Sequence, residues 1–186
     1  MNELGWRLKI EQFAESIGLS VRFQNRRWKS EFLPGIRVWR GSLLVDENRV
    51  LGYGDVFHEM GHLAVLPSCM RRYASGDIDG SLSRRIDRYF NVASYRDDDQ
   101  TMRALLQSGE VEATAWAYAA MVECGLAPEL RFVIQDIDEW RPATPDEIET
   151  EKFILSQGNH FGVHGLQAAG MTNKREYPKM IRWIQP

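Results

Sequence analysis

Two histidines four residues apart, inside an apolar stretch, constrain the fold of this 186-residue chain more than any other feature. His58 and His62 lie in GDVFHEMGHLAVLP, residues 54–67, where most of the other side chains are apolar. We expect a helix over residues 55–66, which Pro67 ends because proline cannot continue it. Residues four apart lie on the same face of a helix, so both imidazoles point to one place. A buried histidine needs a polar partner, and this helix must therefore pack against an element that supplies one.

The spacing of the two histidines predicts a metal site. His58 and His62 can each present a ring nitrogen to one ion at about 2.0–2.1 Å. Glu59 is rotated to the edge of their face, where it can reach a water beside the ion but cannot easily be a ligand. Two ligands, a base and an open position are what zinc hydrolysis requires. The alternative is a core helix with two unrelated histidines, but the chain has only four histidines, which disfavours chance placement around a glutamate.

Gly61 predicts a close neighbour for this helix. Glycine costs about 1 kcal/mol in a helix interior relative to alanine, so its presence suggests another backbone passing nearby. A second helix is expected over residues 101–124. It is rich in small residues that permit close packing, and these include Ala113, Ala117 and Ala120. A glutamate buried on such a helix needs a cation, which the metal would provide.

Two classes of zinc site are excluded by their third ligand. The pattern HExxHxxGxxH requires glycine at position 65 and histidine at 68, where this chain has Val65 and Ser68. A deformylase supplies a cysteine before its histidine pair, whereas Cys69 follows the pair.

The motif His58-Glu59-x-x-His62, followed by Glu110-x-x-Ala113 on a second helix, resembles the gluzincin arrangement. It is most similar to the ImmA/IrrE-type and HtpX-type metallopeptidases. The resemblance implies an α+β, zincin-like fold: a small sheet whose edge strand precedes the HExxH helix, and a second helix that carries the third ligand. It also implies Glu110 as that ligand, with one Zn²⁺ per chain.

The second motif departs from one family pattern and fits the other better. HtpX-type proteins have an aspartate after the alanine, where this chain has Thr114. The ImmA-type pattern E-x-E-A-N-x-F-A is closer to Glu110-Val-Glu-Ala-Thr-Ala-Trp-Ala117. Glu112, on a different helix face, remains the alternative third ligand. The resemblance covers residues 54–67 and 109–120.

Three short strands are expected before the histidine-bearing helix, over residues 20–24, 36–39 and 42–45. An amphipathic helix over residues 4–17 precedes them. The resemblance makes 42–45 the edge of the sheet, along which an extended peptide can pair. A plain core strand is the alternative.

A second pair of histidines, His160 and His164, lies in the glycine-rich segment 158–165. Its glycines argue against a stable helix. Three interpretations remain open. One of these histidines replaces Glu110 as ligand or donates a hydrogen bond to a developing oxyanion, or the pair forms a second metal site. In the third interpretation, both are loop residues without a role in a site. Elsewhere in the C-terminal part, the Thr144–Glu147 capping box predicts the start of a helix. A last short helix is expected over residues 176–184.

Composition limits the class of protein. The net charge of −3 argues against a nucleic-acid partner, and arginine pairs such as Arg71-Arg72 are expected on a solvated surface. Cys69 and Cys124 are expected to be buried thiols without a disulfide framework. The N-terminus is too charged for a signal peptide, and no apolar run is long enough to span a membrane. We therefore expect one cytoplasmic domain over residues 1–186; its oligomeric state is open.

The predicted function is that of a small zinc metallopeptidase. Glu59 would take a proton from the attacking water and return it to the leaving amine of a peptide or protein substrate. The alternative is a zincin-like metal-binding module with a regulatory role and no turnover. Hydrolysis of a non-peptide amide would use the same residues, and nothing in the sequence specifies a substrate.

Overall fold

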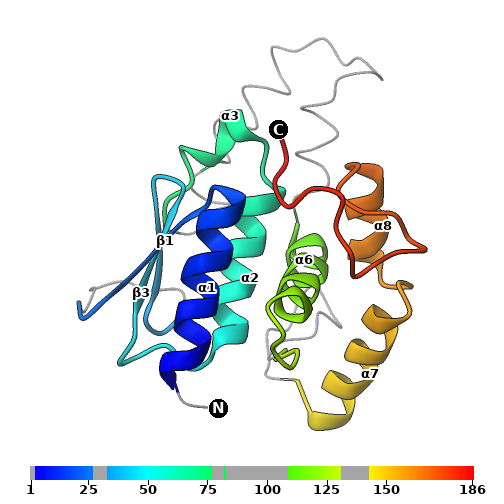
Figure 1. The fold of residues 1–186 in the computed structure, drawn as a ribbon, viewed down its shortest axis with the longest axis horizontal. Helices are drawn as coiled ribbons and strands as arrows, with labels where there is room; N and C mark the ends of the chain where they lie inside the picture. Colours follow the sequence, from blue (N-terminus) through cyan, green and yellow to red (C-terminus); the bar gives the residue numbers. More distant parts are fainter. Residues whose placement is uncertain (1–2, 27–32, 77–81, 83–108, 131–142) are drawn as a thin grey trace.

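The computed structural model describes residues 3–26, 33–76, 82, 109–130 and 143–186. Its helices and strands, in chain order, are α1 (Glu3–Ile17), β1 (Ser20–Gln24), β2 (Ile36–Trp39), β3 (Ser42–Asp46), α2 (Tyr53–Val65), α3 (Ser68–Arg71), α6 (Glu110–Glu123), α7 (Pro145–Ser156) and α8 (Phe161–Ala168). Figure 1 shows the sheet on one side, then α1 and α2, then α6, with α7 and α8 beyond it. The expected α+β class is confirmed. Among the described residues, no helix is long and apolar enough to cross a membrane.

The sheet has the strand order β1–β3–β2, so β3 is its middle strand. The expectation that residues 42–45 form an edge is therefore wrong. A tight turn, in which Arg40 and Gly41 both have positive φ, folds β2 back antiparallel along one side of β3. β1 pairs with the other side in parallel. Leu43 and Val45 are fully buried against the helices, so β3 is a core strand, which was the alternative interpretation of residues 42–45.

An aromatic cluster joins the helices to the end of the chain. The ring of Phe13 on α1 lies 6.2 Å from Phe57 on α2 and 5.9 Å from Trp116 on α6. Trp183 completes the cluster, 4.9 Å from Phe13, and its carbonyl accepts a hydrogen bond from the Trp116 indole. The expected helix over residues 176–184 is absent from this described segment, because these contacts hold the chain in an extended and turned path instead.

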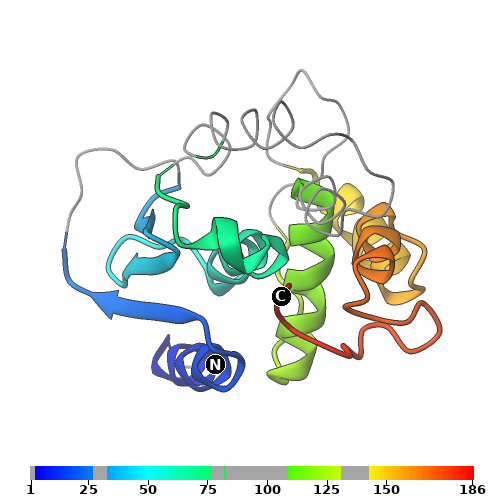
Figure 2. The ribbon, with the colours of Figure 1, turned by 90° about the horizontal axis from the view of Figure 1, so that it is seen from above.

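Close contact between α2 and α6 confirms the interpretation of Gly61. A Cβ atom on Gly61 would lie 2.6 Å from the carbonyl oxygen of Ala113. The two backbones can approach this closely only because neither residue has a larger side chain. Figure 2 shows α6 lying between α2 and α8. The expected helix 101–124 is described from Glu110 onward; residues 101–108 lie outside the described residues.

The segment from His160 onward is helical, against expectation. Its glycines serve close packing instead of breaking α8. A Cβ atom on Gly162 would lie 1.8 Å from the Val111 carbonyl oxygen, and one on Gly165 would lie 2.2 Å from the Glu112 carboxylate. Burial against α6 therefore outweighs the low helix propensity of glycine.

Three smaller expectations have clear outcomes. The capping box of α7 is confirmed, since the Thr144 amide donates to the Glu147 carboxylate at 2.7 Å. Arg71 is not a solvated surface residue: its guanidinium donates to the carbonyls of Leu63 and Leu66 at the end of α2. Cys69 is exposed instead of buried, and it is Met70 of the short helix α3 that is buried.

Candidate metal centre

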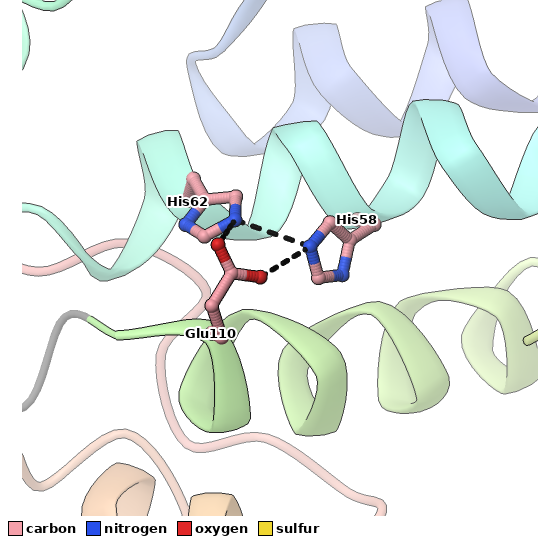
Figure 3. Close-up of side chains that lie close together, drawn as sticks. All are labelled: His58, His62 and Glu110. Carbon is pink, nitrogen blue, oxygen red and sulfur yellow. Dashed lines mark hydrogen bonds and ion pairs between the residues drawn. The ribbon is translucent and has the colours of Figure 1, made fainter. Parts of the chain in front are cut away.

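Three side chains from two helices converge on one point (Figure 3). His58 and His62 come from successive turns of α2, and Glu110 is the first residue of α6. Each histidine Nε2 faces a different carboxylate oxygen of Glu110, at 3.0 Å for His58 and 3.3 Å for His62. The two Nε2 atoms lie 3.1 Å from each other. The structure thus brings together the two histidines and the glutamate that the sequence motifs singled out.

Hydrogen atoms alone cannot satisfy this triangle. Its three contacts would need three hydrogens, but each Nε2 atom carries at most one and an ionised carboxylate carries none. If both nitrogens donate to Glu110, their N–H groups oppose each other across the 3.1 Å contact. If one nitrogen is unprotonated, its contact with the carboxylate sets two acceptors against each other. A cation among the three atoms removes this conflict, because all three then act as electron-pair donors.

The size of the triangle suits a small tetrahedral ion. Ligands about 2.0–2.1 Å from a tetrahedral centre are separated by about 3.3 Å. The observed separations of 3.0, 3.1 and 3.3 Å are close to this value. Two imidazoles and one carboxylate are a donor set that zinc accepts in catalytic sites, with a fourth position left open. The chemistry of these residues therefore fits zinc, although it does not identify zinc among divalent metals.

The surroundings of Glu110 favour its ionised form. Burial acts to raise its pKa, but hydrogen bonds with His58 and His62, together with their charge, hold that pKa well below its ordinary range. The carboxylate is therefore ionised at neutral pH, as a metal ligand must be. The three side chains are 12–31% exposed, so the centre is partly shielded but open to solvent.

Glu112, the alternative ligand, has a different environment. Its carboxylate accepts a hydrogen bond from the Gly109 amide at 3.2 Å and packs against Gly165 of α8. It is 8% exposed, and burial raises its pKa in spite of backbone hydrogen bonds and the nearby His160. Among the described residues, the group that could hold a metal includes Glu110 and does not include Glu112.

Glu59 is half-buried on α2, between the two histidines in the sequence. Its placement one position after His58 rotates it about 100° around the helix axis from that residue. Its side chain is partly exposed to solvent.

The second pair of histidines does not join the centre. His160 caps α8: its Nδ1 atom accepts from the Gly162 amide at 3.1 Å. Its Nε2 atom must then carry the hydrogen, which it donates to Glu151 at 2.7 Å. Both nitrogens are thus engaged, while His164 is exposed on α8.

The Glu151–His160 pair was not found from sequence, since the partners lie on different helices with a turn between them. It lines a cavity of about 290 Å³ between α6, α7 and α8, together with Val111, Thr114, Ile154, Asn159 and Phe161. Thr114 lies one helical turn after Glu110 on α6, so the cavity flanks the helix face that carries the third candidate ligand.

Comparisons with known protein families, with curated proteins and with solved structures found no match. Function is therefore inferred from the side chains themselves.

Proposed function

We propose that this chain is a zincin-like, zinc-dependent hydrolase, and specifically a small metallopeptidase. His58, His62 and Glu110 would hold one zinc ion, and Glu59 would be the general base. The observation that supports this proposal is the convergence of the three ligand atoms, which all lie within 4.8 Å of one another. The resemblance to gluzincin motifs supports the same assignment from the sequence.

Each residue has a distinct task in this proposal. When bound, zinc would act as a Lewis acid toward the scissile carbonyl and would lower the pKa of a water toward about 7. Neutral His58 and His62 and ionised Glu110 provide the electron pairs that hold the ion. Glu59 accepts the proton of the attacking water and delivers it to the leaving nitrogen. The packing of Gly61 against Ala113 fixes the distance between the helices that carry these groups.

The first test is the metal content of the purified protein. The wild type, Glu110→Ala and Glu112→Ala should be loaded with zinc, desalted and measured by elemental analysis. We expect about one zinc per chain in the wild type. Glu110→Ala should lose it, whereas Glu112→Ala, which removes a carboxylate from the same turn of α6, should retain it. A wild type without zinc would contradict the proposal, and loss in Glu112→Ala alone would move the ligand to that residue.

The second test separates an enzyme from a regulatory metal-binding module. Glu59→Gln preserves the size of the side chain but cannot accept the proton. This variant should retain zinc and lose at least about a hundredfold in the rate of cleavage of a mixed peptide library. Unchanged cleavage by Glu59→Gln would refute the assignment of the base. A zinc-loaded wild type that cleaves nothing in the library would favour the regulatory alternative.

A further inference from the structure

The net charge of −3 conceals a strong separation of charge along the chain. Residues 18–26, 33–45 and 60–76 contain six arginines and no aspartate or glutamate. The remaining 17 of the 23 basic residues share the rest of the chain with all 26 acidic residues. The average charge therefore does not describe every part of the chain.

The three acid-free segments lie together around the sheet. The first contains β1 and the second contains β2 and β3, which pair in one sheet. The third runs past the Arg40–Gly41 turn, where the Gly41 amide donates to the Ala74 carbonyl at 3.0 Å. The Gly76 amide donates to the Val38 carbonyl at 2.8 Å. The segment 71–76 is thereby held beside β2 and the turn that follows it.

The strand register places basic and aromatic side chains on one face of the sheet. Arg22, Leu44 and Arg37 form one row across β1, β3 and β2, and Ser20, Ser42 and Trp39 form the next. Side chains alternate along a strand, so these rows face away from the buried Leu43. α1 and α2 cover the opposite face (Figure 1).

The aspartate at the end of this face does not neutralise it. Asp46 is 2% exposed, and its carboxylate accepts a hydrogen bond from the Asn48 amide. Glu47, which follows it, pairs with Arg7.

Trp39 is exposed between two arginines. Its side chain is 45% exposed, and the guanidinium carbons of Arg37 and Arg40 lie 5.2 and 5.4 Å from the centre of its ring. Nearby, Arg72 lies 4.7 Å from the ring centre of Tyr73. The backbone of Arg72 lies beside Gly41, the residue that follows Arg40. The exposed ring leaves apolar area in contact with water, and exposed apolar area of this kind can mark a binding site.

We propose that this basic sheet face, with Arg22, Arg37 and Trp39 on the strands, Arg40 in the turn after β2 and Arg72 beside that turn, binds single-stranded nucleic acid. A base stacks on Trp39 in place of a guanidinium group that lies over its ring, and the arginines contact the phosphates on either side of that base. An acidic peptide would use the charges but would not use the indole. A duplex keeps its bases stacked inside and offers Trp39 only its backbone. The face does not include the metal ligands, so the inference stands apart from the proposed hydrolase.

The test is fluorescence anisotropy with labelled RNA and DNA strands of about 12 nucleotides and mixed sequence. The wild type should bind single strands more tightly than the matching duplex, and affinity should fall between about 50 and 200 mM salt. Arg37→Ala/Arg40→Ala should weaken binding at least about tenfold and reduce the slope of log affinity against log salt by about 1.4. Trp39→Ala should weaken it about tenfold with little change in that slope.

The matched control is Arg175→Ala/Arg182→Ala, which removes two exposed arginines from the C-terminal segment and changes the net charge equally. It should bind as the wild type does, and Glu110→Ala should also bind, which separates this result from any failure of the metal proposal. Circular dichroism confirms that each variant is folded. Equal weakening by the control, no binding by the wild type at about 100 µM oligonucleotide, or binding of polyglutamate in place of nucleic acid would each overturn the inference.

Discussion

At the scale of single residues, two glutamates in the first turn of α6 show how position decides chemistry. Glu110 faces two imidazoles, whose hydrogen bonds and charge overcome burial and lower its pKa. Glu112 is turned toward α8 and a backbone amide, and its burial raises its pKa. The same side chain is thus held ionised at one position and resists ionisation at the other. Of the two, Glu110 is the one that lies in a group of side chains that could hold a metal.

The two cysteines allow a prediction of the same kind. Burial raises the pKa of the Cys124 thiol to about 11, with Lys9 opposing the shift. At pH 8 about one molecule in a thousand then carries the thiolate, which is the reactive form. Cys69 is exposed and open to reagents. Iodoacetamide should therefore alkylate Cys69 at least about tenfold faster than Cys124, as measured by peptide mass spectrometry.

The pH dependence provides the internal control. Because Cys124 titrates at about 11, its alkylation rate should rise about tenfold per pH unit between about pH 7 and 9. Equal labelling of the two thiols, or a flat pH profile for Cys124, would show that burial does not govern its reactivity.

At the scale of elements, the contact between α2 and α6 is the feature on which the site depends. A methyl group at Gly61 would lie 2.6 Å from the Ala113 carbonyl oxygen, and this contact with the backbone cannot be relieved by a side-chain rotation. Gly61→Ala should destabilise the protein by about 1–3 kcal/mol in urea unfolding, despite the better helix propensity of alanine. It should also weaken zinc binding, because the helices must separate.

Gly5→Ala is the control, since Gly5 is an exposed residue of α1. There the same substitution should be neutral or stabilise by up to about 1 kcal/mol. A Gly61→Ala variant as stable as Gly5→Ala would mean that the two helices are not in close contact.

Local sequence patterns were enough to predict those strands and helices that depend on residues close together in the sequence. The expected strands over residues 20–24, 36–39 and 42–45 correspond to β1, β2 and β3, and the pattern ending at Pro67 corresponds to α2. Within the candidate site, the closeness of His58 and His62 follows from helix periodicity alone.

Features that depend on distant parts of the chain were predicted poorly. The glycines of α8 disfavour a helix locally, and only the adjacent backbone of α6 explains them. The middle position of β3 depends on both of its partners, and the non-helical path of the C-terminal segment depends on contacts of Trp183 with Phe13 and Trp116. The place of Glu110 beside the histidines likewise required the family resemblance, because no local rule joins residues 52 positions apart.

At the scale of the whole molecule, the proposed zinc ion would connect two parts of the chain. α2 packs on the sheet together with α1, whereas α6 packs on α8. Ligands from both helices mean that binding requires their native packing, so the unfolded chain cannot bind in the same way. Zinc at a hundred times its Kd should then stabilise the folded protein by about 2.7 kcal/mol. For a domain of this size, that free energy corresponds to a rise of about 5–10 °C in Tm.

This linkage can be measured by thermal unfolding with and without zinc. The wild type and Glu112→Ala should both show the rise in Tm, and a chelator should reverse it. Glu110→Ala should show no rise. Its Tm without metal should stay near that of the wild type, because the substitution also removes three polar contacts that hydrogen bonds alone cannot satisfy. An equal rise in Glu110→Ala would place the stabilising zinc elsewhere on the chain. A rise confined to the proteins with Glu110 would show that this residue of α6 takes part in the zinc binding that stabilises the folded chain.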